Sequence, residues 1–98
     1  MDKIEIIARL RARRDILQKA GVEHLAIFGS RARGDDRADS DLDVLLDVAS
    51  ERKFSLIDLV GVERLIGEAV ETPVSAIMRR SLKPDFIARI APDVTDVF

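Results

Sequence analysis

Two short apolar runs joined by a polar stretch constrain most strongly what this chain can fold into. The first, Val22–Phe28, stops at Gly29-Ser30, and the second, Asp41–Val48, opens with Asp-Leu-Asp. Runs of this length that are rich in β-branched residues and bounded by glycine or polar clusters are typical of strands. Because successive side chains of a strand point to opposite faces, the apolar residues at the even positions of the second run are expected to be buried. The aspartates at odd positions would then lie together on the other face.

Apolar periodicity predicts helices around these strands. Residues 2–20 carry apolar side chains at helical spacing, with Asp2 as the N-cap. Ser55 and Asp58 resemble a capping box before Leu56–Val70, a stretch apolar enough for a core and a partner surface. The predicted buried stripes contain Ile4, Ile7, Leu10 and Leu17 in the first helix and Leu56, Leu59, Val60, Ile66 and Val70 in the second.

The remaining segments complete a simple order of elements. Val74–Met78 is predicted to be a third strand and Leu82–Ile90 a short last helix, while the polar residues Arg31–Ser40 form a loop with room for one helical turn. The order helix, strand, strand, helix, strand, helix predicts one small sheet with helices packed against it, an α/β (α+β) architecture. We expect a single domain that spans residues 1–98.

Composition limits the classes of protein to consider. The chain has 98 residues, no cysteine and a formal net charge of −2, although 35% of its residues are charged. The lack of cysteine excludes disulfides, thiolate metal sites and a cysteine nucleophile. The balanced charge argues against direct nucleic-acid binding by a dedicated basic module. No apolar run reaches the ~18 residues that span a bilayer, so we expect no membrane partner. The lack of cysteine fits a cytoplasmic protein, which is our expectation.

The aspartates at the start of the second strand are candidate metal ligands. Asp41 and Asp43 would lie ~6.6–7 Å apart on one face, close enough for their carboxylates to join one or two divalent ions. Asp47, ~13 Å beyond Asp43, is too distant for that site. Two neighbouring aspartates repel each other, which favours a bound cation. By themselves they fit a solvated strand face equally well, and the preceding Gly-Ser pair shifts the balance toward a metal.

The Gly29-Ser30 turn has the features of a phosphate site. A glycine at the end of a strand lets backbone N–H groups approach a phosphate without an intervening Cβ, and the hydroxyl of Ser30 adds a donor. Arg31 and Arg33 supply positive charge, and an arginine can hold two phosphate oxygens at once. Such a turn is weak evidence alone. Beside two metal-binding carboxylates it indicates nucleotide chemistry.

The combination resembles the minimal nucleotidyltransferases of the DNA polymerase β-like superfamily, whose hallmark is Gly-Ser, ten residues, and Asp-x-Asp. Here Gly29-Ser30 and Asp41-Leu42-Asp43 have that spacing, and the resemblance covers nearly the whole chain. It implies a small mixed sheet with helices on one face, and transfer of a nucleoside monophosphate from an NTP to a hydroxyl with release of pyrophosphate. Asp41 and Asp43 would bind Mg²⁺, and Gly29-Ser30 would seat the β- and γ-phosphates.

The resemblance also implies a biological role. Small bacterial members of the superfamily are antitoxins that act with a HEPN-type RNase toxin and attach AMP to a tyrosine of that toxin. The resemblance therefore implies ATP as the donor, a HEPN-type toxin as the partner, and antitoxin activity. The sequence leaves open the base preference, the acceptor and the oligomeric state.

One position departs from the family pattern. Active relatives carry a third carboxylate on a later strand as a general base, and Ser75 stands at the matching place in Val74-Ser75-Ala76-Ile77. Serine cannot act as a base near neutral pH, and Glu71, the nearest upstream carboxylate, precedes Pro73 and is expected off the strand. Two other functions therefore stay open. One is a pseudoenzyme that binds NTP–Mg²⁺ and neutralises or scaffolds a partner by contact, and the other is a nucleotide-sensing regulator.

Overall fold

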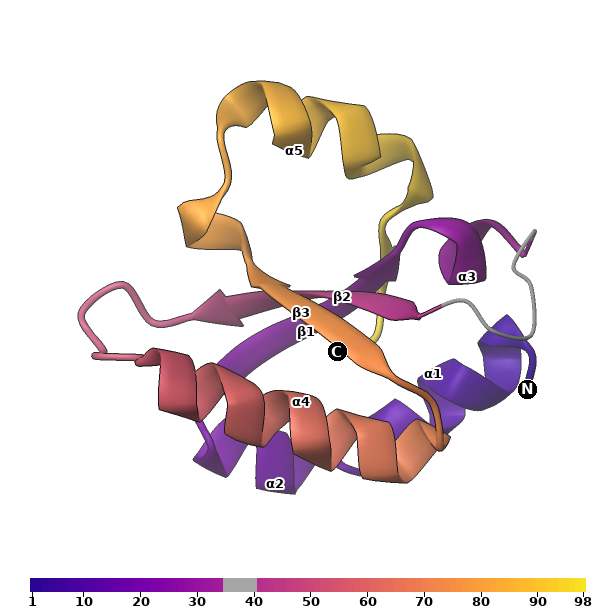
Figure 1. Ribbon diagram of the computed structural model, residues 1–98, viewed down its shortest axis with the longest axis horizontal. Coiled ribbons are helices and arrows are strands. Elements are labelled where there is room, and N and C mark those ends of the chain that lie inside the picture. Colours follow the sequence, from indigo (N-terminus) through magenta and orange to yellow (C-terminus); the bar gives the residue numbers. More distant parts are fainter. Residues whose placement is uncertain (35–40) are drawn as a thin grey trace.

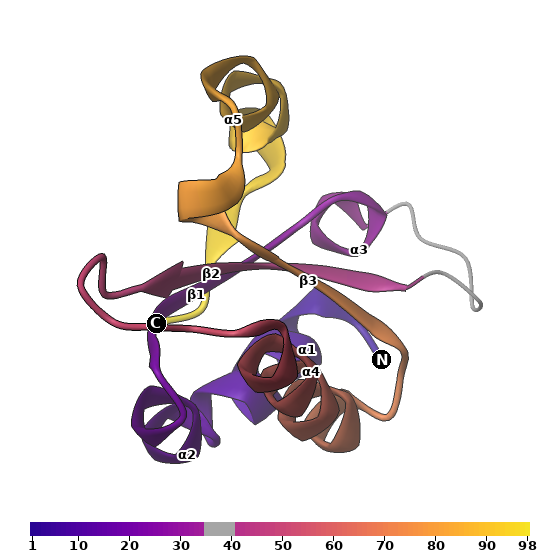
Figure 2. The same cartoon turned by 60° about the vertical axis from the view of Figure 1, so that its left-hand side comes forward.

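The computed structural model describes residues 1–34 and 41–98, and it contains a four-stranded sheet with helices on both sides (Figure 1, Figure 2). The strands are β1 (Val22–Phe28), β2 (Leu42–Val48), β3 (Val74–Met78) and β4 (Thr95–Asp96). The α-helices are α1 (Lys3–Arg11), α2 (Arg14–Lys19), α3 (Ser30–Arg33), α4 (Leu56–Val70) and α5 (Pro84–Ile90). Two 3-10 turns, η1 (Arg79–Ser81) and η2 (Ala91–Asp93), flank α5.

The sheet is mixed and has the strand order β3-β2-β1-β4. β1 runs antiparallel to both β2 and β4, whereas β2 and β3 are parallel. Parallel neighbours need a crossover connection, and α4 provides it. The three strands predicted from the sequence are confirmed, with β2 beginning at Leu42 rather than at Asp41. The short β4, which the sequence did not reveal, forms one edge of the sheet.

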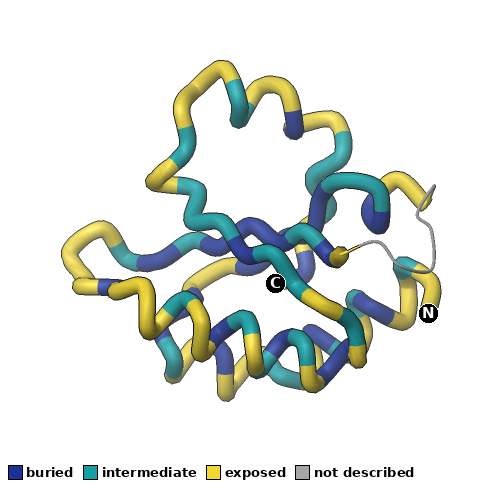
Figure 3. The backbone as a smooth tube through the Cα atoms, in the orientation of Figure 1, coloured by how far each residue is buried: buried dark blue, intermediate teal, exposed yellow. Residues whose placement is uncertain are grey.

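One face of the sheet carries the main core. α1, α2 and α4 cover this face (Figure 2), and the even-numbered side chains of β2 point into it, as their alternation predicts. Fully buried side chains come from every layer, including Leu10 of α1, Leu17 of α2 and Ile66 of α4. In Figure 3 the buried segments run along the sheet and along the inner sides of these helices. The domain is therefore held together mainly from this side.

The opposite face carries a smaller apolar cluster. Ala26, Phe28 and Leu45 of the sheet contact Ile90 of α5, and Phe86 packs against them. The prediction of a small mixed sheet with packed helices is confirmed. The predicted last helix is α5, which begins at Pro84 rather than at Leu82, and α3 and α5 lie on the face opposite α1, α2 and α4 (Figure 1, Figure 2). The reason is that this face is not uniformly polar. Its apolar side chains need cover, and α5 supplies it.

The N-terminal helix predicted for residues 2–20 is divided into two helices. Asp2 caps α1 as predicted, because its Oδ1 accepts a hydrogen bond from the Glu5 N–H at 2.9 Å. The chain then turns at Arg13, whose N–H donates to the carbonyl of Leu10, only three residues back, at 3.0 Å. Sequence periodicity does not register such a turn, since apolar residues on both sides of it still point to the same core.

The predicted buried stripes are partly wrong. In α1 Leu10 is buried as predicted, but Ile6 is buried in place of Ile4, which is 80% exposed. In α4 Leu56 and Val60 are exposed, and Val62 is buried instead. Both helices carry apolar side chains on more than one side, so hydrophobicity alone does not select the side that faces the sheet. Contact with the strands decides it.

α4 begins at the capping box that the sequence predicts. The Asp58 N–H donates to Oγ of Ser55 at 3.2 Å, and the Ser55 N–H donates to Oδ2 of Asp58 at 2.8 Å. Further along the helix, Oε2 of Glu63 accepts a hydrogen bond from the backbone N–H of Ala76 in β3 at 2.8 Å. Across residues 1–34 and 41–98, no helix combines the length and apolar character needed to cross a membrane.

Candidate functional site

The two sequence motifs meet where β1 ends and β2 begins. Phe28, the last residue of β1, pairs with Asp43 of β2, so the turn that follows lies against the Asp43 side chain. Gly29 has φ +77°, and a Cβ added to it would lie 2.5 Å from Oδ2 of Asp43. Glycine is therefore favoured by the backbone conformation, and any side chain here would displace the Asp43 carboxylate. The sequence predicts only a phosphate-approach role for this glycine, and the structure adds its close approach to the carboxylate.

Asp41 and Asp43 form an acidic pair beside this turn. Asp41 is exposed just before β2, and Asp43 is half-buried on the strand. Burial, and then the negative charge of Asp41, raise the pKa of the Asp43 carboxyl, while the positive charge of Arg33 acts in the opposite direction. A carboxylate that is partly withdrawn from water beside a like charge is stabilised by a cation. The oxygen ligands present suit a hard divalent ion.

Ser75 lies directly beside Asp43 on the neighbouring strand. The two are register partners in the parallel β2–β3 pair, so their side chains share one face of strands that lie ~4.8 Å apart. A carboxylate at position 75 would therefore join the acidic pair, whereas serine contributes only a hydroxyl. Within the described residues, no group of three or more histidine, cysteine or acidic side chains is placed to hold a metal ion.

Ser30 and Arg31 begin α3, which is the single helical turn predicted for the loop. Ser30 is half-buried, and Arg31 is buried, with 7% of its surface exposed. Nη2 of Arg31 donates a hydrogen bond to Oγ1 of Thr72, just before β3, at 3.3 Å. Arg31 thus ties the Gly-Ser turn to the strand that carries Ser75. Residues 35–40 of the predicted loop lie outside the described residues.

Arg33, the other predicted phosphate ligand, is exposed and extends toward the C-terminal part of the chain. Its Nη1 forms an ion pair with Oδ2 of Asp93 in η2 at 2.9 Å. Asp93 is not recognisable as part of the site from the sequence. The two residues are 60 positions apart, and no local pattern distinguishes Asp93 from other surface aspartates. Only the packing of η2 beside α3 brings them together.

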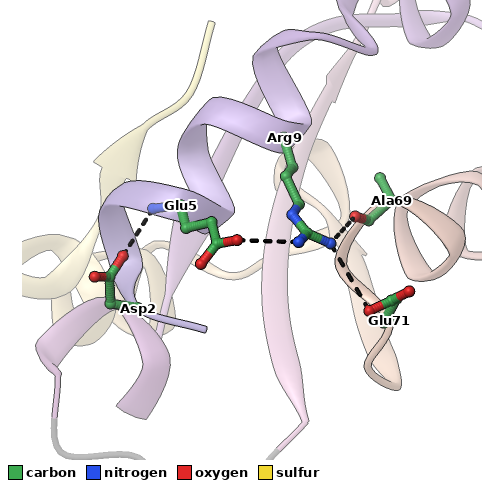
Figure 4. A network of polar contacts seen from close by, with 5 residues as sticks. All are labelled: Asp2, Glu5, Arg9, Ala69 and Glu71. Atoms are coloured by element: carbon green, nitrogen blue, oxygen red, sulfur yellow. Dashed lines mark hydrogen bonds and ion pairs between the residues drawn. The ribbon is translucent and has the colours of Figure 1, made fainter.

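Two other carboxylates near these segments, Glu71 and Asp47, point away from the site. Glu71 caps the C-terminus of α4 with φ +53° and forms an ion pair with Arg9 of α1 at 3.9 Å, in the network that Figure 4 shows. The expectation that Glu71 lies off the strand is confirmed. Asp47, excluded by its distance along β2, pairs with Arg79 at 2.8 Å.

Comparison with known proteins agrees with this geometry. The chain matches the model of the nucleotidyltransferase domain family over residues 10–94, which include both motifs and Ser75. It is 34% identical over 82 residues to a candidate protein adenylyltransferase of Methanocaldococcus jannaschii, covering 84% of this chain and 86% of that protein. It is 28% identical over 85 residues to the protein adenylyltransferase MntA of Thermococcus cleftensis, covering 87% of this chain and 84% of that protein.

The fold also occurs among solved structures. The crystal structure of a toxin–antitoxin with AMP-PNP superimposes with a TM-score of 0.73 at 15% identity, covering 92% of this chain and 72% of that one. At this level of identity the likeness establishes a shared fold. The family model and the two relatives add the family to the fold, because their matches include the segments that form the site.

Proposed function

This chain belongs to the nucleotidyltransferase domain family, and we propose that it is a Mg²⁺-dependent enzyme that transfers AMP from ATP to a hydroxyl group of a partner protein. The observation that carries the proposal is the close approach of Gly29 to Asp43, which brings the proposed phosphate-binding turn beside the acidic pair. The choice of AMP and of a protein acceptor is supported by a relative that is a protein adenylyltransferase.

The residues of the site divide the work of binding. The backbone of Gly29-Ser30 and the Ser30 hydroxyl would bind the β- and γ-phosphates, with positive charge from Arg31 and Arg33. Asp41 and Asp43 would hold Mg²⁺, which proteins commonly bind through one or two carboxylates together with substrate phosphates. When bound, the ion would neutralise phosphate charge and stabilise the leaving group.

Transfer requires an attacking oxygen in line with the leaving group. The acceptor oxygen would form a bond to the α-phosphorus as the bond from that atom to the pyrophosphate oxygen breaks, and pyrophosphate would leave. Positioning by the strand ends supplies most of the catalysis. The hydroxyl proton must go to a group other than Ser75, so we expect the partner protein or solvent to accept it and turnover to be slow.

We further propose that the partner is a HEPN-type RNase toxin, that its modification neutralises it, and that the pair works in the cytoplasm. The support is the motif resemblance together with the fold shared with a solved toxin–antitoxin. Attachment of AMP adds a bulky negative group to the acceptor, which would oppose binding of an RNA phosphate backbone at the modified position.

A second candidate function is favoured by Ser75. Because no carboxylate stands beside Asp43 at that position, the site resembles one that binds NTP–Mg²⁺ without transferring it. The protein would then neutralise or scaffold its partner by contact. This candidate predicts that NTP–Mg²⁺ binds to the protein and later dissociates from it as unchanged NTP.

Label transfer distinguishes the two candidates. The protein is incubated with α-³²P-labelled ATP, GTP, CTP or UTP and Mg²⁺ in host lysate, and the products are separated on protein and RNA gels. The control is the double variant Asp41→Asn/Asp43→Asn. A protein band that requires both aspartates supports the transferase and identifies its acceptor. Measurable NTP–Mg²⁺ binding with no labelled product in any lane supports the binding-only function.

A further inference from the structure

A cavity of about 210 Å³ lies beneath α5, on the same face of the sheet as Asp43. Most of its wall is apolar and comes from β2, α5 and the segment that leads to β4. Arg79 and Asp96 are the charged residues of the lining. The apolar lining consists of Leu45, Ile87, Ile90, Ala91 and Val94.

The cavity lies on the same face of the sheet as the site, one step further along β2. Leu45 follows Asp43 by two residues on β2, so both side chains point to the same face, ~6.6–7 Å apart along the strand. On the parallel neighbour, Ile77 pairs with Leu45 just as Ser75 pairs with Asp43. The Gly-Ser turn lies at the Asp43 end of this row. A molecule held by its phosphates at that turn therefore has the cavity on the far side of the acidic pair.

The polar groups of the cavity make it suitable for a flat heterocycle rather than an aliphatic chain. Nε of Arg79 is held by Oδ1 of Asp47 at 2.8 Å, which fixes the guanidinium at the cavity wall. A planar guanidinium stacks well on aromatic rings. Asp96 contributes a carboxylate that accepts hydrogen bonds, and carboxylates pair in this way with exocyclic amino groups of bases.

We propose that this cavity binds the base of the nucleotide and that Asp96 favours bases with an exocyclic amino group, such as adenine, over uracil. The inference rests on the proposed function, because it assumes that the phosphates bind at Gly29-Ser30. The apolar walls exclude water from the two ring faces, and the stacked ring gains contact area on entering. The competing occupant is a side chain of the acceptor protein. An apolar side chain would leave the carboxylate of Asp96 and the guanidinium of Arg79 without partners in the cavity.

The chain contains no tryptophan, which makes a sharp test available. Ile87→Trp places a large ring in the cavity wall, and its fluorescence reports on the site. The matched control is Ile57→Trp, the same change on α4, where Ile57 is 83% exposed. Dissociation constants are measured for ATP and for inorganic tripolyphosphate, both with Mg²⁺. We expect Ile87→Trp to weaken ATP at least about tenfold and to leave tripolyphosphate unchanged, whereas Ile57→Trp changes neither.

A second variant covers the case in which the tryptophan disturbs folding. Asp96→Ala shortens an exposed side chain on β4, and we expect it to reduce the preference for ATP over UTP severalfold while tripolyphosphate binds as before. The inference would be overturned if ATP bound with equal affinity to the Ile57→Trp, Asp96→Ala and folded Ile87→Trp variants. Unchanged ATP binding with reduced transfer to the acceptor would also overturn it and assign the cavity to the acceptor side chain.

These outcomes are separable from failure of the proposed function. If the cavity is unrelated to the base, ATP–Mg²⁺ still binds and still requires Asp41 and Asp43. If the proposed nucleotide site at Gly29-Ser30 and the two aspartates is wrong, neither ATP nor tripolyphosphate binds to the unmodified protein in a manner that depends on these aspartates. The tripolyphosphate measurement on the unmodified chain therefore decides between the two failures.

Discussion

Gly29 serves two neighbours at once, namely the backbone turn that leads into α3 and the carboxylate of Asp43. Its positive φ alone disfavours a side chain, and the carboxylate 2.5 Å from a hypothetical Cβ excludes one without a shift. The Gly29-Ser30 turn and the acidic pair are thus coupled through this close approach. A substitution in the turn should therefore displace the Asp43 carboxylate, and a substitution of Asp43 should alter the turn.

Gly29→Ala should weaken both stability and nucleotide binding. We expect a loss of at least about 1 kcal/mol in the free energy of unfolding and loss of Mg²⁺-dependent ATP binding, because Asp43 must move. Chemical denaturation and equilibrium binding measure the two effects. Gly34→Ala is the matched control: Gly34 also has a positive φ, +80°, but its added Cβ meets no described atom within 4 Å. If both variants bind ATP equally well, the close approach of Gly29 to Asp43 is not needed for ATP binding.

Asp43→Asn should stabilise the protein in the absence of metal and nucleotide. The raised pKa of Asp43 means that the folded state holds this proton more tightly than the unfolded chain. Stability therefore falls as pH rises from the ordinary aspartate pKa, about 4, through the raised folded value. The asparagine variant lacks this loss, so its Tm should exceed that of the unmodified protein at neutral pH and converge with it at lower pH.

Thermal melts in EDTA across this pH range test the effect. Asp41→Asn relieves the same repulsion from the exposed partner, so it should shift the Tm in the same direction by less. A lower Tm for Asp43→Asn at neutral pH would contradict the argument. In the presence of Mg²⁺ and ATP both variants should lose transfer activity, because each lacks one of the proposed Mg²⁺ ligands. The substitution that stabilises the fold thus removes the function.

Ser75→Asp should increase transfer. The new carboxylate would lie beside Asp43, in position to accept the proton of the acceptor hydroxyl, and a general base contributes about a hundredfold or more. Label transfer at fixed ATP and acceptor concentrations measures the gain. Ser75→Asn provides a side chain of the same shape without the charge and should give none. A folded Ser75→Asp variant with no gain would mean that position 75 is not where the base is missing.

The site residues differ in how far the sequence could reveal them. Gly29 and Asp43 are identifiable because their spacing is local and because strand parity assigns the face of Asp43, whereas Ser75 is identifiable only through the family resemblance. Their mutual contacts follow from strand pairing. Asp93 and Thr72, which bond to Arg33 and Arg31, carry no local signal, since their roles depend on how distant segments pack.

Among the elements, the strands and α4 follow from the sequence more closely than the N-terminal helices. Short β-branched runs and a capping box are local signals, and both produced the expected elements. The turn between α1 and α2 leaves no comparable signal, because its hydrogen bond from Arg13 to Leu10 involves backbone groups only. β4 is two residues long and exists only because β1 offers an edge to pair with.

Ser55→Ala should destabilise α4 at its start. The Ser55 hydroxyl accepts a hydrogen bond from the Asp58 N–H, and loss of an N-cap of this kind costs about 1 kcal/mol. Denaturant unfolding followed by circular dichroism measures the loss. Ser55→Asp retains an accepting oxygen and should recover much of it. Equal stability of the alanine and serine proteins would show that the helix start is held by Phe54 and its packing instead.

For the whole molecule, the two faces of the sheet differ in how many buried side chains they carry. The face under α1, α2 and α4 holds most of the fully buried side chains, whereas the cluster under α5 is small. We therefore expect global stability to depend on the first face. The second face, which carries Asp43 and the cavity, has more freedom to serve binding, as is common for functional sites.

Leu10→Ala should be severely destabilising. Leu10 is fully buried, and truncation of such a leucine costs about 2–5 kcal/mol. Ile16→Ala, in the same helical layer but 47% exposed, should change the free energy of unfolding by only about 0.5 kcal/mol. Urea denaturation at neutral pH compares the two. Similar losses for both would mean that the N-terminal helices pack on the sheet by different sides.

The hydrogen bond from Ala76 to Glu63 has a consequence for behaviour at high concentration. β3 is an outer strand of the sheet, and an outer strand with free N–H groups invites another copy to add to it. Glu63 occupies one of these donors and places a negative charge along the strand, while the opposite border, β4, is only two residues long. Neither border offers a long template, so this chain should resist polymerisation into fibrils, and Glu63→Ala should be the change that weakens this protection.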